Sequence, residues 1–329
     1  MPSKVLLYLD YNKESGFGHI SRSRAFVEAI SSEGTEIFIC SASNPLQSEF
    51  EIGFLWRVNW IPHSQIETMN FDLIYIDSYS EDILSKAENF DIDKKILVID
   101  ANFIEEIPGW PDLVIDLERS SPREHNYNGS YLFADLMIHS ELQSAKTTRD
   151  FNIGTRTDFS NLVAVVNFGG SVSVDHYLRQ LEATFATSNS IFYVVYVPHL
   201  LFETLEIHFR SFINVEVKIF STKYHYDLEN CDFLITNSGT SFMEGLYLGV
   251  PMVIFGLFPN AQSNFNKHRY RKRVIHSCSA VELETQWLNK VLEYFEKEFS
   301  PGTLVDDNLD FVFLDVNAIR TELYSRILN

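Results

Sequence analysis

Cysteine is scarce in this sequence, with three residues in 329, at Cys40, Cys231 and Cys278. They lie far apart and form no CxxC pair, which excludes a disulfide-stapled scaffold and a cysteine-based zinc site. The 14 glycines and 10 prolines are too few for a collagen-like or low-complexity chain. The composition is that of a globular protein, and the cysteine usage fits the reducing cytoplasm.

Positive charge is also scarce, because 26 basic residues face 45 acidic ones and give a formal net charge of -19. Such a surface repels phosphate backbones and anionic lipid, so we expect no nucleic-acid partner. The one dense basic run extends from Lys267 to Arg273. We interpret it as a solvated helix face, with a weak peripheral contact to a membrane or a diphosphate as the alternative.

Long apolar runs are missing as well. No stretch approaches the roughly 18 apolar residues of a membrane-spanning helix, and the longest candidate, residues 191–202, is interrupted by Pro198 and His199. The N-terminal sequence MPSKVLLYLDYNKE returns to charged residues after a few apolar ones, so we predict no secretory signal. These features favour a cytoplasmic protein, and nothing in the sequence indicates its oligomeric state.

Short β-branched runs alternate with segments of helical period, which is the pattern of an α/β fold with parallel sheets. We predict strands at residues 5–10, 36–40, 72–77, 95–100 and 112–116, then at 162–168, 192–197, 215–220, 233–236 and 252–255. Helices are expected at about residues 20–32, 81–89, 174–187, 241–248 and 281–298. The two sets of strands predict two Rossmann-like domains, which agrees with a prior of roughly 100–200 residues per domain.

The predicted domains cover residues 1–145 and 158–315. The polar segment 144–160 lacks an apolar period and is interpreted as the linker. Residues 316–329 have helical spacing, and we expect a terminal helix that packs on either domain, with the N-terminal domain as the first candidate.

Four strands of the first half end in an aspartate: Asp10, Asp77, Asp100 and Asp116. The carboxyl ends of parallel strands face one edge of the sheet, where ligands bind in open α/β folds. An aspartate there also serves to cap the following turn. Asp10 and Asp77 are the stronger functional candidates because informative segments follow them.

A glycine-containing loop with Gly16 and Gly18 follows the first strand and leads into a helix that carries His19 and Arg22. Such a loop brings backbone amides close to a diphosphate or a sugar. The dinucleotide fingerprint fails because Ser21 replaces its third glycine, so NAD is a weak alternative. The helix dipole disfavours the cationic form of His19, which suits a base, although a structural histidine is the alternative.

Two polar loops of the second half also follow strands and offer backbone amides and hydroxyls to a ligand. One contains Gly170 and Ser171 after a strand, and the other comes before a helix that carries Glu244 about one turn in. The second loop and the start of its helix contain Asn237, Ser238, Gly239, Thr240 and Ser241. Loop amides and hydroxyls suit phosphate oxygens, and the glutamate suits a ribose diol. A helix cap that binds no ligand is the alternative.

In order along the chain, the segments GFGHISR, IDSY, NFGGS and NSGTSFMEG resemble the GT-B superfamily of nucleotide-sugar enzymes, and within it most nearly the PseG/SpsG-like family of UDP-sugar hydrolases. The resemblance implies two Rossmann-like domains that face a central cleft. It implies His19 as the catalytic residue, with Tyr79 and Asp10 near the sugar. It also implies that Phe220 contacts the base and that the loop with Gln262 belongs to the donor site.

This resemblance implies a metal-independent hydrolase, without a cofactor, that releases UDP from a UDP-linked amino sugar in nonulosonic acid (pseudaminic acid) or surface-polysaccharide biosynthesis. The chain departs from the hydrolase pattern at residues 20–23, after the histidine, and at residues 237–240, before the glutamate. An inverting GT-B glycosyltransferase is therefore the alternative, and a nucleotide-sugar-binding module without turnover is a third hypothesis. His176, His199 and His208 show no spacing that indicates metal ligation.

Overall fold

The computed structural model describes residues 2–10, 18–31, 34–41, 58–100, 103, 106–117, 127–155, 160–169, 173–188, 190–221, 223–257, 265–266, 274–279, 286–298 and 311–328. The chain divides into two compact units. The first comprises Met1–Ser140 with Phe311–Asn329, and the second comprises Glu141–Asp310. Each contains its own parallel sheet, which confirms the predicted α/β class.

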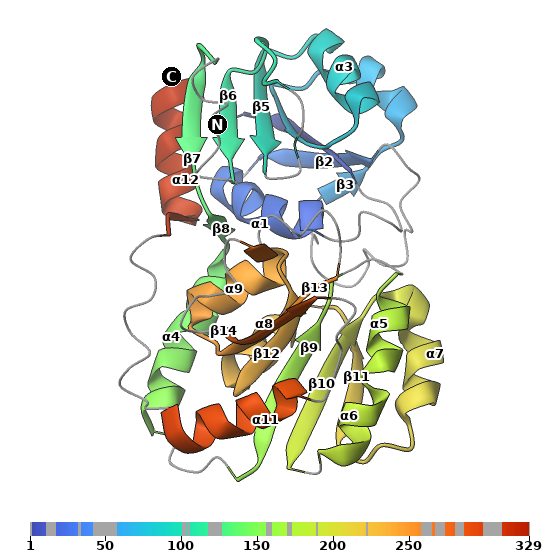
Figure 1. The fold of residues 1–329 in the computed structure, drawn as a ribbon. Coiled ribbons are helices and arrows are strands. Elements are labelled where there is room, and N and C mark those ends of the chain that lie inside the picture. Colours follow the sequence, from blue (N-terminus) through green and yellow to red (C-terminus); the bar gives the residue numbers. More distant parts are fainter. Residues whose placement is uncertain are drawn as a thin grey trace. The chain divides into compact units, whose positions relative to one another are not determined.

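The first unit is built on a seven-stranded parallel sheet with the order β3-β2-β1-β4-β5-β6-β7 (Figure 1). Its strands are β1 (Lys4–Leu9), β2 (Glu36–Ser41), β3 (Val58–Trp60), β4 (Leu73–Asp77), β5 (Lys94–Ile99), β6 (Leu113–Asp116) and β7 (Ser130–Phe133). The order reverses direction between β1 and β4, so their carboxyl ends form the switch point at which open α/β sheets bind ligands.

Successive side chains of β1 alternate between the two faces of this sheet, as the pleat requires. Val5, Leu7 and Leu9 join the cluster with α1 (Gly18–Ile30) and α12 (Val316–Leu323), whereas Leu6 and Tyr8 join the cluster with α3 (Glu81–Asn89). The 3-10 helix His63–Thr68 lies on the second face with α3. Both faces are therefore covered, and the strands read as continuous apolar runs.

The C-terminal segment completes the first unit. α12 contacts α1, and Arg320 Nε donates to the carbonyl of Ala29 at 2.9 Å. A short parallel pair, β8 (Leu136–Ile138) with β15 (Phe313–Asp315), leads into α12, whose N-cap Asp315 accepts from Ala318 N. The helix ends in a π-helical turn, Tyr324–Leu328. α1 is buried around most of its circumference as a result.

The second unit has the sheet order β11-β10-β9-β12-β13-β14. Its strands are β9 (Leu162–Asn167), β10 (Ile191–Val197), β11 (Val215–Ile219), β12 (Phe233–Asn237), β13 (Met252–Gly256) and β14 (Val274–Ser279). Its helices are α4 (Ser140–Thr155), α5 (Val174–Gln180), α6 (Glu182–Thr187), α7 (His199–Phe209), α8 (Lys223–Asn230), α9 (Thr240–Leu248) and α11 (Gln286–Glu293), which runs into a π-helical segment, Tyr294–Glu298.

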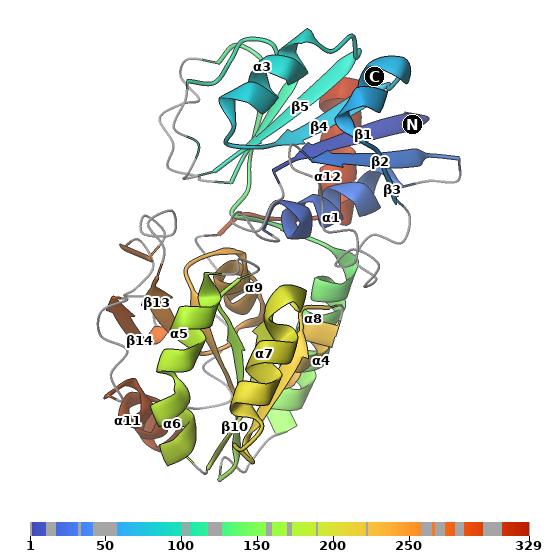
Figure 2. The same cartoon turned by 90° about the vertical axis from the view of Figure 1, so that its right-hand side faces the viewer.

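Helices cover both faces of this sheet (Figure 2). Leu178, Phe185 and Trp287 belong to the core on one face. On the other face, α8 contacts β9, and α9 contacts β12 and β13. The ten predicted strands are confirmed with ends that differ by at most one residue, and the single helix predicted at 174–187 is two helices that meet at Leu181.

The predicted linker is wrong in one respect, because most of segment 144–160 lies in α4. Arg149 on this helix is 2% exposed and donates from Nη1 to the carbonyls of Glu229 and Cys231, at 3.1 and 2.7 Å, with the carbonyl of Leu228 at 3.4 Å. These carbonyls lie at the C-terminal end of α8 and directly after it. A buried arginine that satisfies helix-end carbonyls thus extends the short buried stripe that Leu142 and Ala145 begin on the same helix. No helix among the described residues combines the length and apolarity of a membrane span.

A glycine allows α9 to pack closely on its sheet. A Cβ added at Gly245 would lie 2.8 Å from Met252 Sδ and 2.9 Å from Leu234 Cδ2. Helix propensity alone favours alanine over glycine by about 1 kcal/mol, but overpacking a core typically costs about 1–3 kcal/mol.

We therefore expect Gly245→Ala to lower the free energy of unfolding by up to about 2 kcal/mol, measured by chemical denaturation. Gly109→Ala is the control, since a Cβ there has no atom within 4 Å. Equal or higher stability of Gly245→Ala would contradict the close-packing explanation.

Candidate functional site

The first candidate site surrounds the side chain of Asp77, the last residue of β4, which is fully buried. β4 pairs with β1 at the switch point of the sheet. α1, which follows β1, begins at Gly18 and presents His19 and Arg22 to Asp77. These two residues are three apart and therefore share a face of the helix.

Asp77 binds both of these side chains. Its Oδ1 lies 2.7 Å from His19 Nδ1, and its Oδ1 and Oδ2 each accept from Arg22, at 2.5 Å from Nη2 and Nε respectively. His19 is 3% exposed and Arg22 is 8% exposed. The arrangement is an aspartate–histidine pair whose carboxylate is also held by a bidentate arginine.

Two further groups extend this network. Arg22 Nη1 donates to Asp100, which directly follows β5. The Tyr79 hydroxyl donates to Asp100 Oδ2 at 2.6 Å and accepts from Arg22 Nη2 at 3.2 Å. The Tyr79 ring also meets the His19 ring edge-on, with centroids 4.8 Å apart. The predicted gathering of strand-end aspartates is thus observed for Asp77 and Asp100.

Asp10 joins the site through the loop after β4. Its Oδ2 accepts from Ser78 Oγ at 2.7 Å and from the backbone amide of Tyr79 at 2.9 Å. Asp10 therefore fixes the position of Tyr79 through its main chain. Asp116, by contrast, accepts from Tyr131 and makes no hydrogen bond to the His19 cluster among the interactions of the described residues.

The charges in this site follow from burial and pairing. Burial alone raises the pKa of Asp77, but Arg22 and then His19 outweigh it, so the pKa lies below its ordinary value. Burial lowers the pKa of Arg22, but Asp77, Tyr79 and Asp100 raise it well above the ordinary value. Burial also raises the pKa of Tyr79. At neutral pH Asp77 is therefore a carboxylate, Arg22 a guanidinium and Tyr79 a neutral phenol.

The observed contacts of Arg22 differ from the role expected for it. From the sequence, Arg22 is a cation placed for an anionic donor. In the structure its guanidinium contacts Asp77, Asp100 and the Tyr79 hydroxyl instead.

The second candidate site lies in the second unit, where the loops after β9 and β12 are joined by two asparagines. Asn167 Nδ2 donates to Ser241 Oγ at 2.9 Å. Asn237 Nδ2 donates to the carbonyl of Phe168 at 2.9 Å, and its Oδ1 accepts from Gly239 N at 3.1 Å. These bonds fix the shape of the loop that leads into α9.

The N-terminus of α9 is the anion-attracting end of this loop. Its N-cap is Gly239, which provides no side-chain cap, and the helix starts at Thr240 with Ser241 next. Ser238 is fully buried. Glu244, in the second turn, is 2% exposed, and its Oε1 lies 3.4 Å from His225 Nε2 on α8.

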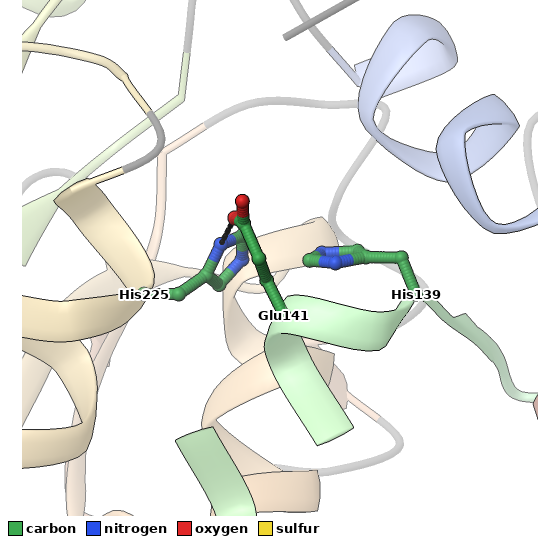
Figure 3. Close-up of side chains that lie close together, drawn as sticks. All are labelled: His139, Glu141 and His225. Atoms are coloured by element: carbon green, nitrogen blue, oxygen red, sulfur yellow. Dashed lines mark ion pairs between the residues drawn. The ribbon is translucent and has the colours of Figure 1, made fainter. Parts of the chain in front are cut away.

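Among the described residues, one group could hold a metal ion: His139, Glu141 and His225 (Figure 3). Their ligand atoms lie within 4.8 Å of one another. Ligand atoms around tetrahedral zinc, at bond lengths of about 2.1 Å, lie only about 3.4 Å apart. The ion pair between Glu141 Oε2 and His225 Nδ1, at 3.8 Å, accounts for two of these side chains without an ion.

Of the remaining predicted site residues, Phe220 lies in the described part of the chain and several others lie outside it. Phe220 directly follows β11 and packs against Tyr196 and Tyr224, with ring centroids 6.1 and 4.9 Å away. Several predicted residues lie outside the described part of the chain: Gly16, Gly170, Ser171, Gln262 and the basic run from Lys267 to Arg273.

Four residues that shape the two sites are not among the site residues assigned from the sequence: Ser78, Asp100, Asn167 and His225. Asp100 carried the same signal as Asp77, an aspartate at the end of an apolar strand, but no informative segment follows it. Asn167 occupies the corresponding strand end in the second unit. No sequence signal marks Ser78, which acts through Asp10.

Comparison with solved structures supports the architecture. HepE from Anabaena in complex with UDP-glucose has a TM-score of 0.59 at 11% identity, covering 98% of both chains. The spinosyn rhamnosyltransferase SpnG with thymidine diphosphate has a TM-score of 0.60 at 12% identity, covering 99% of this chain and 100% of its own. MurG from Acinetobacter baumannii has a TM-score of 0.58 at 10% identity, covering 98% and 99%.

The chain has the GT-B fold. At these identities the likeness shows the fold and extends over nearly the whole chain. No family model matches the sequence, and no curated protein is similar to it. The fold implied by the sequence motifs is therefore confirmed, whereas membership of the PseG-like hydrolase family is not shown.

We expect Asp77→Asn to lower the free energy of unfolding at pH 7 by about 3–5 kcal/mol, because it leaves Arg22 buried with a weakened partner. The pKa of Asp77 is lower in the folded protein than its unfolded value of about 3.9. Its stabilisation is therefore present above about pH 5 and is lost as pH falls through the folded pKa.

Urea denaturation between pH 2.5 and 7 tests this expectation. The unfolding free energy of the wild type should fall more steeply on acidification than that of Asp77→Asn. Asp82→Asn is the control, because Asp82 makes an exposed ion pair with Lys86 and should matter by less than about 1 kcal/mol. Parallel pH curves for wild type and Asp77→Asn would refute the assignment.

Proposed function

We propose that the chain is a glycosyltransferase that uses a nucleoside-diphosphate sugar as donor and His19 as the base that activates an acceptor hydroxyl. The observation that carries the proposal is the buried contact of 2.7 Å between His19 Nδ1 and Asp77 Oδ1. A carboxylate in this position orients the imidazole and stabilises the cation that forms when the second ring nitrogen takes a proton.

The reaction then proceeds as a single displacement. His19 Nε2 accepts the proton of the acceptor hydroxyl, and the acceptor oxygen forms a bond to the anomeric carbon of the donor. The bond between that carbon and the diphosphate oxygen breaks, and its electron pair leaves with the nucleoside diphosphate. A single displacement inverts the configuration at the anomeric carbon. Correctly placed general bases contribute about 10²–10⁴-fold to such rates.

The nucleotide part of the donor is assigned to the loop before α9 and the first turns of that helix. Backbone amides at a helix N-terminus attract phosphate oxygens, and α9 offers them with a glycine N-cap. In this proposal Glu244, on the same helix, accepts hydrogen bonds from a ribose diol. Two GT-B neighbours support a nucleoside-diphosphate ligand, since HepE was solved with UDP-glucose and SpnG with thymidine diphosphate.

Transfer is preferred to hydrolysis because the structural neighbours named as enzymes are transferases, such as the rhamnosyltransferase SpnG and the calicheamicin glycosyltransferase CalG4. Attack by water would employ the same base, so the dependence of UDP release on an acceptor separates the two reactions. The donor site requires no metal in this proposal, because loop amides and the dipole of α9 stabilise the leaving diphosphate.

UDP release from UDP-glucose and UDP-N-acetylglucosamine tests the role of His19, with and without a panel of sugar and alcohol acceptors. We expect release only when an acceptor is present, no change on adding EDTA, and a loss of about 10²–10⁴-fold in kcat for His19→Ala. His176→Ala, on the exposed face of α5, is the matched control.

Equal UDP release with and without acceptor, still lost in His19→Ala, would show a hydrolase. Unchanged transfer by His19→Ala would contradict the assignment of the base.

A separate test addresses the nucleotide site by calorimetry with UDP. We expect Glu244→Gln to weaken UDP binding by about 10–100-fold, because hydrogen bonds to a charged group contribute about 1.5–3 kcal/mol. The same substitution should have a much smaller effect on 2′-deoxyuridine diphosphate, which lacks one hydroxyl of the diol. Glu203→Gln, an exposed glutamate of α7, is the control. An equal loss for both nucleotides would exclude a ribose contact.

A further inference from the structure

The hydrogens of Arg22 are almost fully assigned by its surroundings. The single Nε hydrogen goes to Asp77 Oδ2, and one Nη1 hydrogen goes to Asp100. Nη2 carries two hydrogens and has three neighbours, namely Asp77 Oδ1 at 2.5 Å, His19 Nδ1 at 2.9 Å and the Tyr79 hydroxyl at 3.2 Å. One of the three must therefore go without an Arg22 hydrogen.

The Tyr79 hydroxyl can only accept from Arg22. Its own hydrogen is directed to Asp100 Oδ2 at 2.6 Å, since a carboxylate cannot donate. Tyr79 keeps that hydrogen because burial raises its pKa above the ordinary value. The phenol oxygen thus presents its lone pairs to Arg22, with Asp100 holding it in that orientation.

His19 Nδ1 faces both a donor and an acceptor, so its role depends on the tautomer. If Nδ1 carried a lone pair, it would confront the Asp77 carboxylate at 2.7 Å, and two acceptors at that distance repel each other. If Nδ1 carries the hydrogen, it donates to Asp77, and both Nη2 hydrogens of Arg22 still have acceptors in Asp77 and Tyr79.

We infer that Tyr79 and Asp100 are positioning residues that engage Arg22 and so hold His19 in the tautomer with hydrogen on Nδ1 and a lone pair on Nε2. This inference rests on the proposed function, because the Nε2 lone pair is what a base requires. It differs from the role implied by the sequence resemblance, in which Tyr79 lines the sugar pocket.

Removing the Tyr79 hydroxyl releases one Nη2 hydrogen. That hydrogen then has His19 Nδ1 as its nearest alternative acceptor, at 2.9 Å. The competition favours the opposite tautomer, in which Nε2 carries the hydrogen and cannot accept a proton. Because the bond that is lost is long, at 3.2 Å, and the freed hydrogen exchanges one acceptor for another, we expect a fall in kcat of about two- to tenfold for Tyr79→Phe with an unchanged KM for the donor.

The direct test is nitrogen NMR of the full chain labelled with ¹⁵N-histidine, with the His19 signals assigned by their absence in His19→Gln. We expect the wild type to show a protonated Nδ1 and an unprotonated Nε2 at a pH where the ring is neutral. Tyr79→Phe and Asp100→Asn should both move the two signals toward the opposite tautomer. Tyr75→Phe is the matched control, as the buried Tyr75 hydroxyl has no hydrogen-bond partner among the described residues.

A protonated Nε2 in the wild type would overturn the inference, and so would signals in Tyr79→Phe that match those of the wild type and of Tyr75→Phe. The spectra do not depend on turnover, so they separate this inference from the proposed function. The expected tautomers together with undiminished transfer by His19→Ala would support the positioning network and refute only the assignment of His19 as base.

Discussion

The buried carboxylate of Asp77 is the group on which the site of the first unit depends. A fully buried charge is costly unless it is paired and hydrogen-bonded, and Asp77 obtains both from a single helix, because His19 and Arg22 lie three residues apart on α1. The start of that helix at Gly18 is thereby tied to the end of β4. Asp100 and Tyr79 are then needed because Arg22 has more hydrogens than Asp77 can accept.

In the second unit, the groups that an anion would meet are neutral. The chain carries a formal net charge of -19, and the arginine that the sequence offered for an anionic ligand is occupied by two carboxylates. An anion in the second unit would instead meet backbone amides at the start of α9, in a loop shaped by Asn167 and Asn237. The global charge therefore bears on macromolecular partners and says little about a small ligand.

The strands and their shared edge were predictable because buried parallel strands read as short apolar runs, and an aspartate at the end of such a run has its position set by the sheet. The partners of Arg22 were not predictable from the sequence. They are side chains at the ends of β4 and β5, and these ends converge only after the sheet forms. α4 was mistaken for a linker for a related reason. Its buried anchor is Arg149, whose acceptors are carbonyls about 80 residues away.

The sequence resemblance favoured hydrolysis, whereas the structural neighbours named as enzymes are transferases. The base role proposed for His19 is compatible with both reactions. Removing a proton from water and from an acceptor hydroxyl requires the same base, the same tautomer and the same carboxylate partner. A glycine loop followed by histidine and arginine three residues apart specifies that machinery, because the arginine holds the carboxylate that orients the histidine. Under the proposed function, the motif therefore marks how the proton is removed and does not distinguish a hydrolase from a transferase.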